Sequence, residues 1–190
     1  MLEILAAWTS DHDGVPGAAG DRAADAPQAR DDALCAEAPR LRRLVHRLLG
    51  WRASAADLDD VVQDVLLAAF RHRERFRGDS SLRTWLTTIA LRKAQRHANA
   101  NRRRRRLRSL FGIAEPAVPD RQTDDERLDR TRAAMQQLAH GDREVLVLRY
   151  LEQRDVEEIA SLCGCSRTAV DARLSRARQR LRDRLTGADA

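Results

Sequence analysis

The chain has 190 residues, of which 43% are hydrophobic and 34% are charged, and its formal net charge is +6. This length allows one domain or two small ones, with enough apolar residues for a core. No apolar run reaches the roughly 18 residues of a membrane-spanning helix, and residues 1–8 lack the basic start of a secretory signal. We therefore expect a cytoplasmic protein.

The cysteines and histidines do not form a pattern typical of catalysis. Cys35, Cys163 and Cys165 are too few and too oddly spaced for a disulfide framework, and the last two lack the partners of a structural zinc site. No phosphate loop, metal cluster or nucleophile–base pair is evident. We therefore expect no enzyme activity, no catalytic residue, no metal and no cofactor.

The N-terminal half begins with an irregular stretch and continues with helical patterns. Residues 1–30 are rich in Ala, Gly, Asp and Pro, which predicts a flexible tail. From Asp31 apolar residues recur on one helical face until Gly50, a stop signal. A second helix is predicted from Asp57, a candidate N-cap, to Phe70.

A third predicted helix runs into a strongly basic block. It follows a break at residues 78–81, where Ser80 or Ser81 can cap it. Trp85 lies on its apolar stripe, so we expect this ring in the core and not as a platform for a stacked base. Residues 92–108 contain nine basic residues and no acidic one. Such a block suggests a polyanionic partner, although a solvated helix end or linker would also explain it.

The composition divides the chain into two helical parts. Glycine and proline predict a linker over residues 109–122. Beyond the linker, residues 123–126 form a capping-box pattern, and Asp142 is the candidate N-cap of the next helix. No segment alternates as a strand would. We therefore expect an all-α protein with two small domains, over residues 31–108 and 123–190.

The last two predicted helices form a helix-turn-helix. A short helix begins at Asp155, Gly164 makes a turn, and Ser166 caps a longer basic helix whose apolar stripe faces inward. The residues predicted to face outward, toward phosphates and guanine edges, are Arg167, Arg173, Ser175, Arg176 and Arg180. A helical hairpin with a solvated basic face is the alternative, but the cap, turn and basic helix together favour DNA binding.

Several stretches resemble one family. DLDDVVQDVLLAAF at residues 57–70 looks like the polymerase-binding helix of extracytoplasmic-function (group 4) sigma factors. FRGDSSLRTWLTTIA at 76–90 is similar to the −10 element of their sigma-2 domain. REVLVLRY at 143–150, EEIA at 157–160 and RLSRAR at 173–178 resemble their sigma-4 domain. The blocks follow the family's order.

The resemblance implies a sigma factor that binds core RNA polymerase and directs promoter-specific transcription initiation. In this family the first domain recognises and melts the −10 region, and the helix-turn-helix recognises the −35 region. The implied partners are the β′ clamp helices and β flap of core polymerase and promoter DNA, with association to the nucleoid through polymerase. Many members are held inactive by an anti-sigma factor, and the sequence leaves open whether this chain has one.

The resemblance also implies three sets of contact residues. The polar side of residues 57–70 suits a basic protein partner, and the set implied for core polymerase is Asp57, Asp60, Gln63, Asp64 and Ala68. The set implied for −10 DNA, including the loop that captures an unstacked base, is Arg77, Gly78, Asp79, Ser80, Ser81, Arg83, Arg92 and Arg96. The set implied for −35 DNA is Ser166, Arg167, Thr168, Asp171, Arg173, Ser175, Arg176 and Arg180.

Four residues depart from the family's pattern. Arg92 and Arg96 stand where Asn and Asp are usual, and Ala169 and Asp171 replace a Thr and a Lys. Asp171 can accept a hydrogen bond from a cytosine amino group or repel a phosphate. The promoter sequence that relatives read therefore does not transfer to this chain.

Two other functions fit parts of the pattern. A helix-turn-helix regulator acting without polymerase would not need the acidic side of residues 57–70. A metal-dependent nuclease could use the aspartates of that helix, but a third ligand is not evident elsewhere. Association with core polymerase separates the sigma factor from both alternatives.

Overall fold

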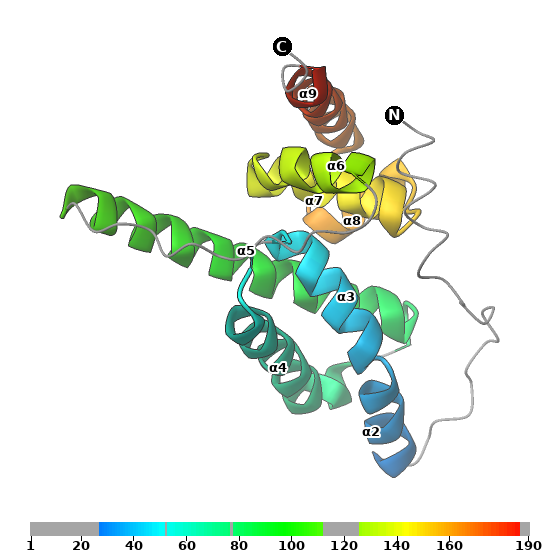
Figure 1. The fold of residues 1–190 in the computed structure, drawn as a ribbon. Helices are drawn as coiled ribbons and strands as arrows, with labels where there is room; N and C mark the ends of the chain where they lie inside the picture. Colours follow the sequence, from blue (N-terminus) through cyan, green and yellow to red (C-terminus); the bar gives the residue numbers. More distant parts are fainter. Residues whose placement is uncertain (1–26, 52, 77, 112–125, 187–190) are drawn as a thin grey trace.

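The computed structural model describes residues 27–51, 53–76, 78–111 and 126–186. Every element in these ranges is helical, which confirms the expected all-α class (Figure 1). The elements in chain order are α2 (Pro27–Ala36), α3 (Ala38–Leu49), α4 (Ala55–His72), the 3-10 turn η1 (Arg73–Arg75), α5 (Leu82–Leu110), α6 (Glu126–Gln136), α7 (His140–Leu146), the π-helical turn η2 (Val147–Leu151), α8 (Val156–Cys163) and α9 (Arg167–Thr186). None of these helices has the length and apolarity required to cross a membrane.

The expected tail and linker lie largely outside the described residues. Of the tail over residues 1–30, only 27–30 are described, and they form the first turn of α2. Of the linker over 109–122, only 109–111 are described, at the C-terminal end of α5. The capping-box pattern at residues 123–126 also lies outside the described residues except for Glu126, where α6 begins.

The helix predicted from Asp31 to Gly50 is two helices in the structure. α2 and α3 are separated at Glu37, and Pro39 lies in the first turn of α3. Proline has no N–H and disfavours a helical residue before it, so it fits the start of a helix better than its interior. Gly50 ends α3 as predicted, with a φ of +93° and its N–H donating to the carbonyl of His46.

Several predicted helix starts are confirmed by their hydrogen bonds. Ser81 accepts from the backbone N–H of Thr84 at 3.1 Å and caps α5. Asp155 and Glu158 form a full capping box on α8. Ser166 accepts from the N–H of Ala169 at 3.2 Å at the start of α9.

Two predicted N-caps are wrong. α4 is capped by Ser54, whose hydroxyl oxygen accepts from the N–H of Asp57 at 3.0 Å, so Asp57 lies inside the first turn. α7 begins at His140, which places Asp142 in the first turn as well. Because acidic residues are favoured throughout the first turn of a helix, composition alone does not separate these positions from the cap.

The first unit, α2 to α5, surrounds a compact apolar core. α3, α4 and the first half of α5 pack on each other. Leu41, Leu44, Val65 and Leu86 are fully buried between them. Trp85 is partly buried against this core, with its ring 5.4 Å from that of Phe76, which confirms its predicted place. The second half of α5 projects away from the body (Figure 1).

The second unit, α6 to α9, contains the helix-turn-helix. Gly164 between α8 and α9 has a φ of +64°, as the predicted turn requires. Val170, Ala177 and Leu181 on α9 are fully buried and pack with α7 and α8. The second unit lies against the first, with α7 on α3 and with α7 and α8 on α5 (Figure 1).

Candidate protein-docking and DNA-binding surfaces

The outward face of α4 is acidic and exposed. Its stripe of Leu58, Val61 and Val65 is buried, while Asp60, Gln63 and Asp64 are exposed. The carboxylate of Asp64 is 61% exposed although it accepts a hydrogen bond from Lys93 of α5 at 3.1 Å. Because its opposite face is buried in the core, α4 holds these charged and amide groups in position for contact with a partner.

The other two residues implied for polymerase contact are less accessible. Asp57 accepts a hydrogen bond from the Ser54 hydroxyl at 2.7 Å and lies 3.4 Å from Nε2 of His97. Ala68 is half-buried. The neighbouring Leu67, which sequence reasoning missed, is 43% exposed and adds an apolar contact to the acidic face.

The loop before α5 is short and open. Arg77 lies outside the described residues. Gly78 has a φ of +77°, and a Cβ added there would meet no atom within 4 Å, so the backbone conformation and not crowding favours glycine. Asp79 and Ser80 are exposed, and Ser81 is occupied as the cap of α5. The loop thus offers polar groups and accessible backbone beside a helix start.

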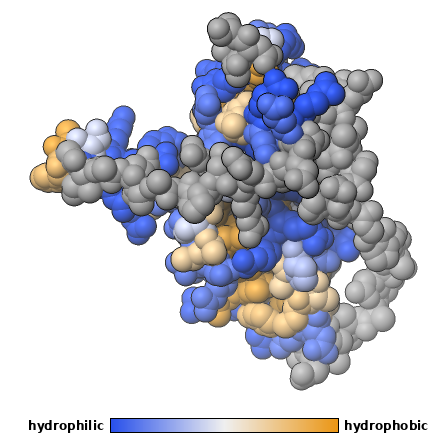
Figure 2. Space-filling view, in the orientation of Figure 1, coloured by the Kyte–Doolittle hydropathy of each residue, from blue (hydrophilic) through white to orange (hydrophobic). Residues whose placement is uncertain are grey.

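The basic block belongs to α5 and not to a linker. Arg92 and Arg96 are exposed, and residues 102–106, all arginine, are exposed on the projecting part of the helix. At 1.5 Å per residue, the stretch from position 92 to 108 spans about 24 Å, or roughly seven base pairs of B-DNA. Figure 2 shows hydrophilic side chains along the described part of this projection and apolar ones at its tip. Arg83 is exposed as well, and it pairs with Glu37, which lies between α2 and α3, at 2.9 Å.

One side of α9 is suitable for entering a groove of DNA. Thr168, Asp171, Ser175 and Arg176 are exposed at the spacing of one helix face. Ser166 precedes them as the cap, and Arg167 is exposed while pairing with Glu157 of α8 at 2.7 Å. The cap and the ion pair fix the start of this helix.

The other two arginines implied for −35 contact also make contacts inside the second unit. Arg180 forms an ion pair with the nearly buried carboxylate of Asp142. Arg173 is only partly exposed, and its charge acts on Glu144 and Cys163. Sequence reasoning placed both arginines outward, but a long guanidinium side chain can reach back to an inner carboxylate.

Burial shifts the pKa values of ionisable side chains on α7 and α8, of which His140, Arg143 and Glu144 are buried and Cys163 is half-buried. Burial lowers the pKa of His140 to about 4, with a further contribution from the Arg143 charge. Burial alone lowers the pKa of Arg143 to about 10, and burial raises that of Glu144 to about 7 against the opposing charge of Arg173. The Cys163 thiol has a pKa raised to about 12, chiefly by burial, so it is not a reactive thiolate.

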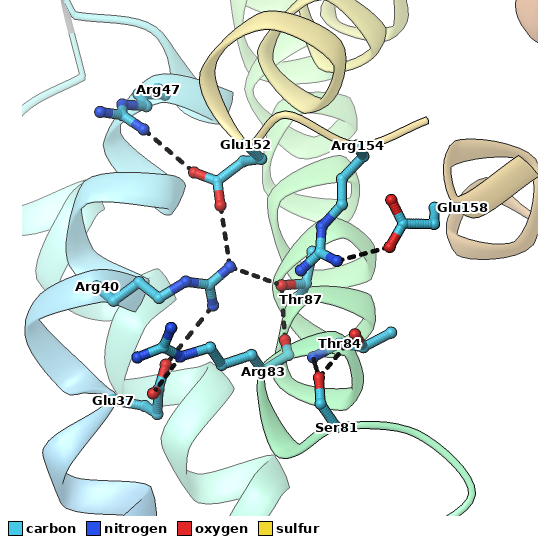
Figure 3. Close-up of polar contacts among 10 residues, drawn as sticks. All are labelled: Glu37, Arg40, Arg47, Ser81, Arg83, Thr84, Thr87, Glu152, Arg154 and Glu158. Atoms are coloured by element: carbon cyan, nitrogen blue, oxygen red, sulfur yellow. Dashed lines mark hydrogen bonds and ion pairs between the residues drawn. The ribbon is translucent and has the colours of Figure 1, made fainter. Parts of the chain in front are cut away.

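The two units are joined by charged contacts that sequence reasoning missed. Glu152, just after η2, accepts hydrogen bonds from Arg40 and Arg47 of α3 (Figure 3). Arg143 of α7 donates to the carbonyls of Leu48 and Leu49 at the end of α3. Within the described ranges, no cluster of His, Cys, Asp and Glu could hold a metal ion.

These surfaces define a helical protein with a basic, helix-turn-helix DNA-binding part and an acidic face for docking another protein. The family model for Sigma-70 region 2 matches residues 36–104, and that for Sigma-70, region 4 matches residues 128–181. The chain belongs to the ECF RNA polymerase sigma factors. The expectation of a factor that directs promoter-specific initiation with core RNA polymerase is confirmed.

Relatives and solved structures agree with this assignment. The chain is 34% identical over 154 residues to the ECF RNA polymerase sigma factor EcfG of Rhodopseudomonas palustris, covering 80% of this chain and 82% of the relative. It is 29% identical over 152 residues to the ECF sigma-E factor of Escherichia coli strain K12, covering 74% and 80%.

Two similar structures are complexes with anti-sigma proteins. The sigma factor RpoE bound to the anti-sigma factor NepR from Bartonella quintana matches with a TM-score of 0.62 and 27% identity, over 84% of this chain and 97% of that one. CnrH bound to the cytosolic domain of CnrY matches with a TM-score of 0.59 and 26% identity, over 100% and 98%.

Proposed function

We propose that the two units of this sigma factor divide the work of initiation. The first unit docks on the β′ clamp helices of core polymerase through Asp60, Gln63 and Asp64 of α4. Its loop at residues 78–81 and helix α5 hold the −10 strand, and α9 reads the −35 duplex. The separation of charge carries this proposal, because an exposed acidic face on α4 would repel DNA while the exposed arginines of α5 and α9 would attract it.

The projecting part of α5 adds to the DNA-binding surface in this proposal. Arg102, Arg103, Arg104 and Arg106 are exposed and point to successive sides of the helix, since neighbouring residues are about 100° apart. Such a cylinder of charge can neutralise phosphates without selecting a sequence. Arg92 and Arg96 lie on the same helix, so the block extends the −10 contact along the DNA.

The remaining properties follow from the same role. The protein performs no covalent chemistry and needs no cofactor, because its function is to position polymerase and open DNA. It acts in the cytoplasm and joins the nucleoid with polymerase. Its domains are residues 31–108 and 123–190, and the anti-sigma proteins bound to its two solved relatives support an anti-sigma partner here as well.

Run-off transcription with purified core enzyme and a pool of genomic promoters tests the proposal. Transcripts from a subset of promoters, dependent on the added factor, are the expected result. Asp60→Lys should reduce transcription and core binding together, whereas Glu126→Gln, an exposed change on α6, should alter neither. Binding to duplex DNA without any association with core polymerase would instead identify a helix-turn-helix regulator.

A further inference from the structure

A single carboxylate connects the two units of the chain. Oε2 of Glu152 accepts from Arg40 at 2.9 Å, and its Oε1 accepts from Arg47 at 3.1 Å. The side chains of Glu152 and Arg47 are each 10% exposed, and that of Arg40 is 18% exposed. Both arginines belong to α3 in the first unit, and Glu152 belongs to the second (Figure 3).

A second contact lies beside the first and involves two helix ends. Arg143 donates to the carbonyls of Leu48 at 3.1 Å and Leu49 at 3.2 Å, where α3 ends. It also donates to the carbonyl of Gln136 at 3.3 Å, where α6 ends. The last carbonyls of a helix lack partners within the helix and carry its negative dipole end, so one buried guanidinium satisfies two helices from different units.

The junction includes the helix proposed to bind the −10 strand. Arg40 donates to the hydroxyl of Thr87 on α5 at 3.2 Å in addition to its bond with Glu152. Thr87 is fully buried, and α5 packs against α7 and α8 of the second unit. The second unit therefore covers part of α5.

The closed form holds the two DNA-binding helices too close together to bind both promoter elements at once. α5 packs on α8 and α8 packs on α9, and packed helices lie about 10 Å apart, so the axes of α5 and α9 come within about 20 Å of each other. Elements centred about 25 base pairs apart are separated by about 85 Å of B-DNA. The two units must part before α5 and α9 can bind their elements on one duplex.

We propose that Glu152, held between Arg40 and Arg47, is the latch of an autoinhibitory contact that keeps the free chain closed. The consequence for transcription rests on the proposed function, but the contact itself does not. Because all three charges regain water when the units part, the latch is reversible and its net strength is modest. Its geometry selects the closed arrangement by placing one carboxylate against two guanidinium groups of the other unit.

Replacing Glu152 tests the contact between the units more specifically than replacing Arg143 does. Arg143 also holds the end of α6 inside its own unit, so replacing it would disturb the second unit as well as the junction. The Glu152 carboxylate accepts its hydrogen bonds from Arg40 and Arg47, which both lie in the first unit. Glu152→Gln keeps the shape of the side chain and removes its charge.

Single-molecule energy transfer on the full-length free chain measures the closed and open populations. The three native cysteines are replaced by Cys35→Ser, Cys163→Ala and Cys165→Ala. Dyes are then attached at Arg71→Cys on α4 and Arg182→Cys on α9, both exposed positions, one in each unit. The wild-type background should give mainly high transfer, and a mainly low-transfer wild type would overturn the proposal.

Glu152→Gln should raise the ratio of open to closed chains by about tenfold or more, which corresponds to about 1.4 kcal/mol. The double variant Arg40→Gln with Arg47→Gln should raise the ratio at least as much, since it also removes the contacts of Arg40 with Thr87 and Glu37. Adding Glu152→Gln to the double variant should change the ratio little further, because the contact of Glu152 with both arginines is already lost. Glu126→Gln, an exposed carboxylate outside this contact, should leave the ratio unchanged.

The results that would overturn the latch differ from the result that would reject the proposed function. Ratios within about twofold of wild type for both Glu152→Gln and the double arginine variant would overturn the latch. If Glu152→Gln lost helical signal by circular dichroism, the arginine variant would decide alone, since its changes lie in the first unit. Absence of run-off transcription by the wild type would reject the proposed function while leaving the energy-transfer result intact.

Discussion

Glu144 should make the stability of this protein fall as the pH rises toward neutrality. The side chain is 8% exposed, and burial raises its pKa from 4.5 to about 7 despite the nearby charge of Arg173. Because the folded chain holds this proton more tightly than the unfolded chain does, the stabilising contribution is complete below about pH 4.5 and is lost as the pH rises through about 7. The full effect is about 3 kcal/mol.

His140 acts in the opposite direction. Burial lowers its pKa from 6.5 to about 4, so its contribution to stability is present above about pH 6.5 and is lost as the pH falls through about 4. The two effects oppose each other between about pH 4.5 and 6.5. The pH dependence of the wild type alone therefore does not isolate either group.

The difference between Glu144→Gln and wild type removes the contribution of His140. Relative to wild type, the variant should gain about 2.5 kcal/mol in its free energy of unfolding between about pH 5 and pH 8. Urea unfolding followed by far-ultraviolet circular dichroism measures this difference at each pH. Glu126→Gln, which removes an exposed carboxylate, should show no such trend. A Glu144→Gln difference that stays constant within about 0.5 kcal/mol over this range would refute the reasoning.

Further changes test the surfaces. Asp60→Lys should leave helicity intact and change stability by under about 0.5 kcal/mol, but it should reduce the amount of core polymerase bound in a pull-down. Arg176→Ala should weaken binding to closed promoter duplex and reduce the salt slope by about one unit in filter binding. Arg92→Ala with Arg96→Ala should instead reduce permanganate reactivity around −10. The loss of DNA binding by this double variant should be largest on pre-melted templates. Arg143→Leu should cost about 3 kcal/mol in urea unfolding, because it leaves the carbonyls at two helix ends without a donor.

Local patterns predicted most of the helices correctly. Apolar stripes at helical spacing marked the buried faces of α4 and α9, and Ser81, Ser166 and Gly164 marked helix ends, because each of these signals acts within about four residues. The errors were local too. A proline in a first turn divided α2 from α3, and acidic first-turn residues were mistaken for caps.

Contacts between distant residues could not be predicted in this way. Glu152 lies 112 positions from Arg40 and 105 from Arg47, and no periodic pattern links residues so far apart. The same limit explains Arg180, whose ion pair with Asp142 joins residues 38 positions apart. Arg180 was predicted to face solvent because the pattern of its own helix does not show that Asp142, on another helix, lies close enough to attract it.

The closed arrangement should affect polymerase docking and promoter binding differently. Asp60, Gln63 and Asp64 on α4 are exposed, so core polymerase can dock while the units are together. The arginines of α5 and α9 are exposed too, but α5 packs on α8 and so holds the two DNA-binding helices too close together for the two elements of one promoter. The latch should therefore restrain promoter binding and not polymerase docking. We expect Glu152→Gln to bind core enzyme with unchanged affinity in a titration while increasing promoter binding by the free chain, and an equal change in both affinities would contradict this order of events.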